Sequence, residues 1–325
     1  MSRVILQPSG KVFAVASGET VLAAGIAAGL ALPFQCGRGD CGTCRATVLD
    51  GEVTRLPAGY FLDGPDACLL CRTEVRGDVT IACDEVDSLP GLPLCALPAR
   101  VAGLEKPVAE VAILRLTLPP GHGLVWRAGQ HVQVRLRDGS RHACFLATAP
   151  GHGDGLELHI PRTPGDSFAD QVFGRLRVRD MLWVEGPFGR FHLDDDTRPV
   201  ILLAEGIGLA PLKAMVEEMA SRAPGRPGTL YWSGRRAVDL YALEHAEAWA
   251  RTMPDLTFVP VLAAPEAGWG GRVGTVPEAV LSDHPDLSGH VVRACGSPEM
   301  VAAVRSAVLA QGGLAAADFS AATLV

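Results

Sequence analysis

The sequence predicts a multidomain protein that combines an α+β unit, an antiparallel β-barrel and a parallel α/β domain. The chain has 325 residues, which suits two or three compact domains better than one. Two changes in the residue pattern mark the borders between the domains. They are a stretch rich in proline at residues 87–98, and a switch from short β runs to alternating strands and helices after residue 199. We therefore expect domains at residues 1–90, 98–195 and 196–325.

The N-terminal part has the pattern of a small α+β unit. Apolar runs at residues 4–6 and 12–15 flank a Pro-Ser-Gly turn, which predicts a β-hairpin. Thr20 is a suitable N-cap for a helix that continues to about residue 30. Short strands are expected at residues 45–49 and 79–82, after a loop rich in cysteine.

The rest of the chain shows two further patterns. Short β runs separated by glycine and proline turns predict a small antiparallel barrel, with runs at residues 111–118, 131–137, 155–161 and 181–184. Beyond residue 199, strands alternate with helices, which predicts a parallel sheet. The strands are expected at residues 200–204, 229–232, 257–261 and 290–294, and the helices at 210–220, 242–252 and 298–311.

Composition and charge narrow the class of protein. The net charge of −7 argues against a nucleic-acid partner, because such proteins need a basic face to displace counterions. Charged or polar residues interrupt every apolar run before it reaches the length of a membrane span, and we expect no signal peptide. Five of the nine cysteines fall between Cys36 and Cys71, which favours a metal site in a reducing compartment over disulfides. A cytoplasmic location is therefore expected.

The cysteine loop carries the strongest chemical signal. Cys36, Cys41 and Cys44 have the spacing C-x4-C-x2-C, and Cys71 is a candidate for a distant fourth ligand. This spacing is typical of a plant-type [2Fe–2S] cluster, whose irons are bound by soft thiolates. Three glycines inside the loop let the backbone wrap closely around a cluster.

Two alternatives remain at this loop. Cys41 and Cys44 together with Cys68 and Cys71 also form a pair of C-x2-C motifs, which would suit a zinc ribbon. That interpretation leaves Cys36 without a role. Within the iron–sulfur interpretation, Cys68 could replace Cys71 as the fourth ligand.

Taken together, the motifs resemble a known family. Residues 1–90 resemble plant-type ferredoxin domains, which implies a β-grasp fold and favours Cys71 over Cys68. Residues 100–325 resemble the ferredoxin–NADP reductase superfamily. The joint order is similar to the NAD(P)H-dependent iron–sulfur flavoprotein reductases that serve oxygenases and deoxysugar dehydratases. The resemblance implies that hydride passes from NADH or NADPH to FAD, and single electrons pass through the cluster to a partner protein.

The flavin motifs of that family are present in altered form. The turn Ala128-Gly129-Gln130 and the segment at residues 186–189 match. His142 stands where the family has an arginine that meets the FAD pyrophosphate. Cys144 takes the place of a tyrosine that stacks on the flavin in the family. Phe145 takes the place of a serine that lies near the reactive nitrogen of the flavin. Arg141 lies one residue early and could substitute only if a β-bulge re-aimed it.

A later segment of the flavin motif is also altered. Gly165, Asp166 and Ser167 correspond to a glycine pair with a trailing serine in the family. Asp166 would place a carboxylate in a region where the family binds phosphate, which is electrostatically unfavourable.

The nicotinamide motifs follow in the last domain. A glycine turn where a strand passes into a helix is a natural cradle for a pyrophosphate. The resemblance assigns nucleotide contacts to Gly206, Ile207, Gly208, Pro211, Arg235, Arg236, Cys295 and Gly296. It places Cys295 near the nicotinamide, which makes it the catalytic candidate. The alternative is that Cys295 is only a buried residue at the end of a strand.

The altered motifs leave a second hypothesis for function. The chain could be a [2Fe–2S] electron carrier or structural subunit of a larger complex, whose reductase half has lost flavin or nicotinamide binding. In the favoured hypothesis it is an NAD(P)H-dependent electron-transfer reductase whose partner is an oxygenase or dehydratase.

Overall fold

The computed structural model describes residues 2–30, 32–34, 37, 39, 42–58, 62, 64–83, 95–137, 139–153 and 155–324. The chain forms two compact units. The first contains Met1–Cys95 and Gly186–Arg190, and the second contains Ala96–Glu185 and Phe191–Leu324. No helix among the described residues is both long enough and apolar enough to cross a membrane.

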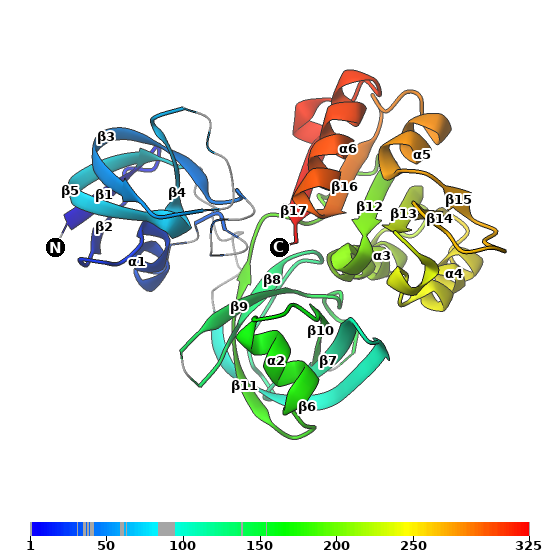
Figure 1. The fold of residues 1–325 in the computed structure, drawn as a ribbon, viewed down its shortest axis with the longest axis horizontal. Helices are drawn as coiled ribbons and strands as arrows, with labels where there is room; N and C mark the ends of the chain where they lie inside the picture. The colour runs from blue at the N-terminus through cyan, green and yellow to red at the C-terminus, as the bar shows by residue number, and fades with distance from the viewer. Residues whose placement is uncertain are drawn as a thin grey trace. The chain divides into compact units, whose positions relative to one another are not determined.

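The first unit is a mixed five-stranded sheet with one helix packed on it (Figure 1). The strand order is β2-β1-β5-β3-β4, in which β1 and β5 are parallel and the other pairs are antiparallel. The elements are β1 (Ser2–Gln7), β2 (Val12–Val15), α1 (Val21–Ala27), β3 (Arg45–Arg55), β4 (Ala67–Leu69) and β5 (Thr73–Ala82). A hairpin, a covering helix and a central parallel pair make this the predicted β-grasp unit.

Helix α1 shows how closely local sequence fixes this unit. The Thr20 hydroxyl accepts a hydrogen bond from the Ala23 amide at 3.3 Å, so the predicted N-cap is confirmed. The helix ends three residues earlier than predicted. Gly29 has φ of +77°, a left-handed conformation that commonly terminates helices.

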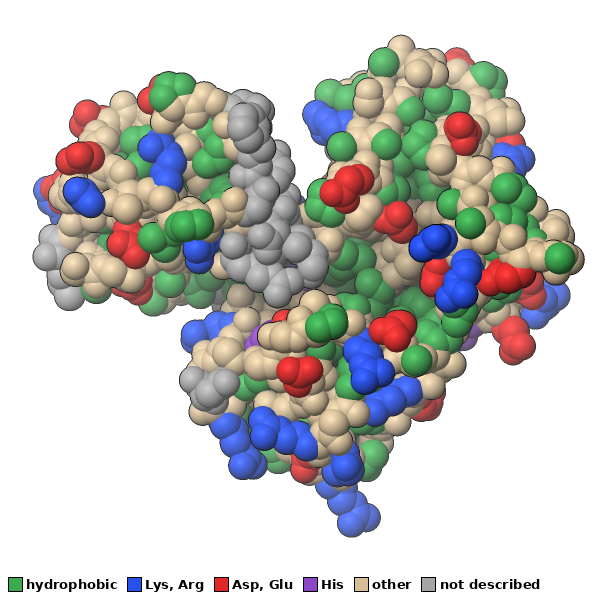
Figure 2. Space-filling model, viewed as in Figure 1, with side chains coloured by type: hydrophobic (Ala, Val, Ile, Leu, Met, Phe, Trp, Pro, Cys, Tyr) green, Lys and Arg blue, Asp and Glu red, His purple; other side chains and the backbone are tan. Residues whose placement is uncertain are grey.

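The second unit begins with a six-stranded antiparallel barrel. Its strand order is β10-β7-β6-β11-β8-β9, and a bridge between Leu146 and Leu158 joins the region of the two edge strands. The elements are β6 (Cys95–Val108), β7 (Val111–Thr117), β8 (His131–Arg135), β9 (Arg141–Phe145), β10 (Gly155–Pro161), α2 (Ser167–Gly174) and β11 (Met181–Phe188). Figure 2 shows Lys and Arg side chains gathered over this barrel, and the loop before β11 contributes the exposed Arg175, Arg177 and Arg179.

The predicted linker at residues 87–98 was wrong at its C-terminal end. Strand β6 begins at Cys95, and residues 84–94 lie outside the described residues. Pro98 is compatible with this strand because the described pairing with β7 starts only at Arg100, so its missing amide removes no bond of that ladder. The short helix α2 was not predicted either, although Asp166 provides a clear N-cap.

The last part is a parallel sheet covered on both faces. Its order is β15-β14-β13-β12-β16-β17, with α3 and α4 on one face and α5 and α6 on the other (Figure 1). The elements are β12 (Val200–Glu205), α3 (Leu209–Arg222), β13 (Gly228–Gly234), α4 (Leu243–Thr252), β14 (Leu256–Leu262), β15 (Arg272–Val273), α5 (Val276–Asp283), β16 (Val291–Gly296), α6 (Pro298–Ala310) and β17 (Phe319–Thr323). Helix α5 and strands β15 and β17 were not predicted.

The strand order of this sheet reverses between β12 and β16. From β12 the chain moves outward through β13, β14 and β15, and then returns to the other side of β12 for β16 and β17. In open α/β sheets, ligands bind at the carboxyl ends of the strands beside such a reversal. Here those ends carry Gly206–Gly208 and Cys295–Gly296.

The barrel and the parallel sheet share one hydrophobic core. Phe145 and Phe191 of the barrel region belong to the same buried cluster as Leu212, Met215 and Trp232 of the α/β domain. Gly129 is required at this junction, because a Cβ atom there would lie 2.4 Å from both the Phe191 carbonyl oxygen and the Met215 methyl group.

Candidate cofactor sites

Two of the four predicted cluster ligands can be located, and they lie together. Cys44 and Cys71 are buried, and their Sγ atoms are 3.3 Å apart, although 27 residues separate them in the sequence. A tetrahedral metal with metal–sulfur bonds of about 2.3 Å holds two sulfurs about 3.8 Å apart. The pair therefore fits two ligands of one metal ion with little movement. Cys36 and Cys41 lie outside the described residues.

The competing fourth ligand, Cys68, has a different environment. It lies on β4, is fully buried and pairs across the sheet with Ala46. Burial raises the pKa of its thiol to about 11, despite a hydrogen bond with Thr73. The contact between the Sγ atoms of Cys44 and Cys71, together with the position of Cys68 inside the sheet, favours Cys71 as the proposed ligand.

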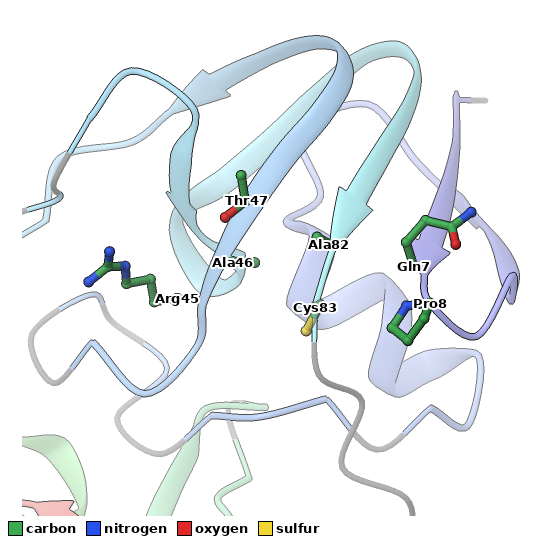
Figure 3. Close-up of a pocket in the computed structure, with 7 residues that line it drawn as sticks. All are labelled: Gln7, Pro8, Arg45, Ala46, Thr47, Ala82 and Cys83. Carbon is green, nitrogen blue, oxygen red and sulfur yellow. The ribbon is translucent and has the colours of Figure 1, made fainter. Parts of the chain in front are cut away.

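The first unit also has an open hollow of about 540 Å³, drawn in Figure 3. It is lined by Gln7, Pro8, Arg45, Ala46, Thr47, Ala82 and Cys83. Figure 3 shows these residues coming from the ends of β1, β3 and β5. Among the described residues that line it, Arg45 directly follows the proposed ligand Cys44 in the sequence.

Three predicted flavin residues come together on the barrel. His142 Nδ1 lies 3.2 Å from the Asp166 carboxylate, and its Nε2 lies 3.1 Å from the Ser167 hydroxyl. Ser140 Oγ is a further 3.3 Å neighbour of Nε2, and the ring packs against Phe168. Asp166 also accepts hydrogen bonds from the first amides of α2, as its N-cap. The carboxylate is therefore committed to His142 and the helix.

This cluster can hold the phosphates of FAD, but with fewer donors than an arginine would supply. An imidazole and two hydroxyl groups converge there, and Gly165 beside them has φ of +80° with open space around it. The predicted conflict between Asp166 and phosphate is reduced, because His142 and two amides share the negative charge. The residues present therefore fit the cofactor.

The other predicted flavin residues lie apart from this cluster. The pairing of β8 with β9 is regular, so no bulge turns Arg141 towards the side of His142, and Arg141 instead binds Glu185 at 3.0 Å. Cys144 is buried, which raises the pKa of its thiol, and Phe145 is packed in the core shared with the α/β domain. Neither Cys144 nor Phe145 is open to solvent.

The predicted nucleotide residues meet at the reversal in strand order. Gly208 lies directly against β16, since a Cβ atom on it would be 2.0 Å from the Cys295 carbonyl oxygen. Glu205 accepts a hydrogen bond from the Ser297 amide at 2.8 Å, and its side chain packs against Gly296. Its carboxylate is thus directed to the start of α6. The glycine turn and the Cys295–Gly296 segment are therefore in contact at the carboxyl ends of β12 and β16, the position where open α/β sheets bind ligands.

The remaining nucleotide candidates lie in the same turn, in α3 and at the end of β13. Ile207 is half-buried in the turn, and Pro211 is buried in the first turn of α3. Arg235 and Arg236 are exposed at the end of β13, where their backbone amides bind the Asp239 carboxylate at 2.7 and 2.8 Å. Cys295 is fully buried, and burial raises the pKa of its thiol, so it is a neutral thiol at neutral pH.

A polar network between the barrel and the α/β domain was not predicted. Lys213 of α3 donates to the Ala147 carbonyl at 2.9 Å and lies 3.3 Å from Glu157 of β10. Glu217 accepts from the Ala149 amide at 3.1 Å. The only signals in the sequence are the i,i+4 spacing of Lys213 and Glu217 and the polar residues inside an otherwise apolar strand.

Comparisons with known proteins identify the three modules. Residues 4–76 match the 2Fe-2S iron-sulfur cluster binding domain, residues 99–193 the oxidoreductase FAD-binding domain, and residues 202–306 the oxidoreductase NAD-binding domain. These matches confirm the predicted cofactors: a [2Fe–2S] cluster rather than zinc, FAD, and NADH or NADPH.

Curated relatives match along nearly the whole chain. The CDP-6-deoxy-L-threo-D-glycero-4-hexulose-3-dehydrase reductase of Yersinia pseudotuberculosis is 31% identical over 312 residues, which cover 95% of this chain and 94% of the relative. Reductase component 1 of terephthalate 1,2-dioxygenase from Comamonas is 32% identical, covering 96% of this chain and 94% of the relative. The crystal structure of an Amycolatopsis cytochrome P450 reductase superposes with a TM-score of 0.81 at 29% identity, covering 100% of this chain and 99% of that one.

The fold, the order of the modules and these relatives agree, and they confirm electron transfer from NAD(P)H to a partner as the function. The chain belongs to the NAD(P)H-dependent iron–sulfur flavoprotein reductases.

Proposed function

We propose that this reductase delivers its electrons to the oxygenase or dehydratase component of a two- or three-protein system, alone or within a larger complex. The supporting observation is the joint presence of the three modules in one chain. Relatives with the same order are named as reductases of a terephthalate dioxygenase, a phenol monooxygenase and a hexulose dehydrase. A reducing cytoplasm suits the thiolate ligands of the cluster.

For the cluster, we propose Cys36, Cys41, Cys44 and Cys71 as ligands. The buried Cys44–Cys71 pair supports this choice, whereas Cys68 is fully buried within strand β4. The cluster belongs to the proposed first domain, residues 1–90, and the flavin and nucleotide sites to the proposed domains 98–195 and 196–325.

For the flavin, we propose that His142 and Ser167 contact the phosphates, while Asp166 orients the imidazole of His142. Bound FAD supplies a site that takes two electrons as a hydride and gives them up singly, which is needed because nicotinamide donates pairs and the cluster accepts single electrons. Gly165 leaves space for the phosphates. Arg141, Cys144 and Phe145 are given no direct contact with the phosphates, because Arg141 binds Glu185 and the other two side chains are buried.

For the nucleotide, we propose that the turn Gly206–Gly208, with Ile207 and the first turn of α3 at Pro211, holds the pyrophosphate. Arg235 and Arg236 would contact the adenosine ribose or its phosphate, as exposed cations at the end of the adjacent strand. Cys295 and Gly296 would line the nicotinamide end, with Cys295 as the catalytic candidate.

The route of electrons can be tested with two acceptors. Cys71→Ser should still reduce ferricyanide with NADH or NADPH, because ferricyanide takes electrons from flavin, but it should lose most reduction of cytochrome c through the cluster. Cys68→Ser should retain both activities and two iron atoms per chain. Loss of the cluster in Cys68→Ser alone would contradict the proposed ligands. Purified protein that binds no FAD on titration, and whose cluster NAD(P)H cannot reduce, would contradict the reductase function.

A further inference from the structure

A series of contacts between buried and half-buried residues joins the barrel to the glycine turn of the α/β domain. On β10, the Glu157 carboxylate lies 3.0 Å from His159 Nε2, and His159 Nδ1 lies 2.6 Å from the Tyr241 hydroxyl. The Tyr241 ring packs edge-on against Trp232, with centroids 5.4 Å apart at 85°. The indole N–H of Trp232 donates to the Gly206 carbonyl at 2.8 Å.

Charge fixes the direction of these hydrogen bonds. Burial alone would raise the pKa of Glu157, but the hydrogen bond with His159 and the charges of Lys213 and Arg115 lower it to about 2, so the ionised carboxylate only accepts. Burial lowers the pKa of His159, whose ring is therefore neutral at neutral pH. Since Nε2–H donates to Glu157, Nδ1 accepts the O–H of Tyr241.

At the other end, the Gly206 turn is in contact with Trp232. Gly206 has φ of +51°, and no atom lies within 4 Å of the position that its Cβ would occupy. Side-chain packing at that position therefore does not hold the turn. The carbonyl of Gly206 accepts one hydrogen bond from the Leu209 amide within the turn and one from the indole of the fully buried Trp232, which is the side-chain contact of this carbonyl. The Tyr241 ring in turn packs against Trp232.

We propose that Glu157, His159 and Tyr241 are positioning residues of the nucleotide site, which act through Trp232 on the Gly206 turn. They would set the turn relative to the flavin barrel, since His159 belongs to the barrel and Tyr241 to the α/β domain. This inference rests on the proposed binding of nucleotide at Gly206–Gly208. It predicts that removing one hydroxyl of this series weakens nucleotide binding, although that hydroxyl does not itself contact the nucleotide.

The test is Tyr241→Phe, which keeps the ring and removes the hydroxyl. Binding of NAD+ and NADP+ to the oxidised, FAD-loaded protein is measured by calorimetry, so that the readout does not depend on turnover. The dissociation constant of the preferred nucleotide should rise about fivefold, the effect of one lost hydrogen bond. FAD content should stay at the wild-type level.

Tyr231→Phe is the matched control. Tyr231 is buried one residue before Trp232 on β13, and its hydroxyl donates to Asp283 at 2.8 Å, outside the series. This variant loses a comparable buried hydrogen bond and should lower the melting temperature, but it should leave the dissociation constant within about twofold of wild type.

A double-mutant cycle separates positioning from general destabilisation. Trp232→Phe removes the N–H that binds Gly206 and should weaken nucleotide binding by itself; combined with Tyr241→Phe, the two effects should be less than additive. Trp232→Phe also carries the test if Tyr241→Phe does not fold.

The outcomes are distinct. If Tyr241→Phe and Tyr231→Phe bind nucleotide equally well, or if the cycle is additive, the positioning role is overturned while the proposed function stands. If the natural protein binds neither NAD+ nor NADP+, the proposed nucleotide site and this inference both fail.

Discussion

Gly208 offers the sharpest prediction for the proposed nucleotide site. Its φ of −58° suits any residue, so alanine brings no backbone strain, and the whole cost comes from contact. The new Cβ would lie 2.0 Å from the Cys295 carbonyl oxygen, whereas ordinary contact begins at 3.4 Å. The turn and β16 would have to separate by about 1.4 Å, the difference of these two distances. Overpacking of this kind costs about 1–3 kcal/mol.

That separation would displace the turn on which we place the nucleotide. In Gly208→Ala we expect the KM for the preferred nicotinamide nucleotide to rise about 10- to 100-fold, and flavin reduction in anaerobic stopped-flow to slow. FAD content should be unchanged. Gly289→Ala is the control, because it adds the same methyl group in the same domain where nothing lies within 4 Å. Wild-type KM and flavin reduction in Gly208→Ala would refute the placement of the nucleotide.

Three further predictions follow from the other sites. His142→Arg should lower the dissociation constant of FAD about tenfold in a fluorescence titration, because a guanidinium group can pair with both Asp166 and phosphate; weaker binding would show that Asp166 captures the arginine. Cys71→Ser should lose the rhombic EPR signal of the reduced cluster and Cys68→Ser should keep it, and the opposite pattern would reverse the ligand assignment. Glu157 has a pKa of about 2 in the folded chain, against about 4.3 in the unfolded chain. Its ionised form therefore contributes up to about 3 kcal/mol to the free energy of unfolding above pH 4.5, and this contribution is lost as the pH falls towards 2. Glu157→Gln should therefore flatten the pH dependence of the unfolding free energy below pH 4.5, and an unchanged slope would contradict the pKa.

Much of the architecture could be predicted because its signals are local. The cluster type is encoded by Cys36, Cys41 and Cys44 on one loop of nine residues, where spacing alone constrains how sulfur can surround iron. Period-two β runs and the alternation of strands with helices distinguish the barrel from the parallel sheet in the same way. The errors occurred where local signals are weak, as at Cys95–Val108, in which Pro98 and the preceding residues resemble a linker.

The functional sites depend on partners that are distant in the sequence. His142 and Asp166 are 24 residues apart, and His159 and Tyr241 are 82 residues apart. From the sequence, His142 and Asp166 look like two separate losses in the flavin motif. In the structure they form one pair, because the imidazole of His142 is hydrogen-bonded to the Asp166 carboxylate. No periodicity or spacing could have paired them.

The sequence by itself determined the type of cluster and the three modules, because metal-ligand spacing and strand or helix periodicity act over a few residues, and its resemblance to a known family implied FAD and the nicotinamide nucleotide. Only the tertiary structure decided that Gly208 packs against Cys295 and that Glu157, His159 and Tyr241 connect the barrel to the turn at Gly206. These contacts follow from the order of strands, in which β12 lies beside β16, and from the docking of the barrel on the parallel sheet. That strand order results from burying the apolar faces of all the strands and helices together, and no short stretch of the chain determines it.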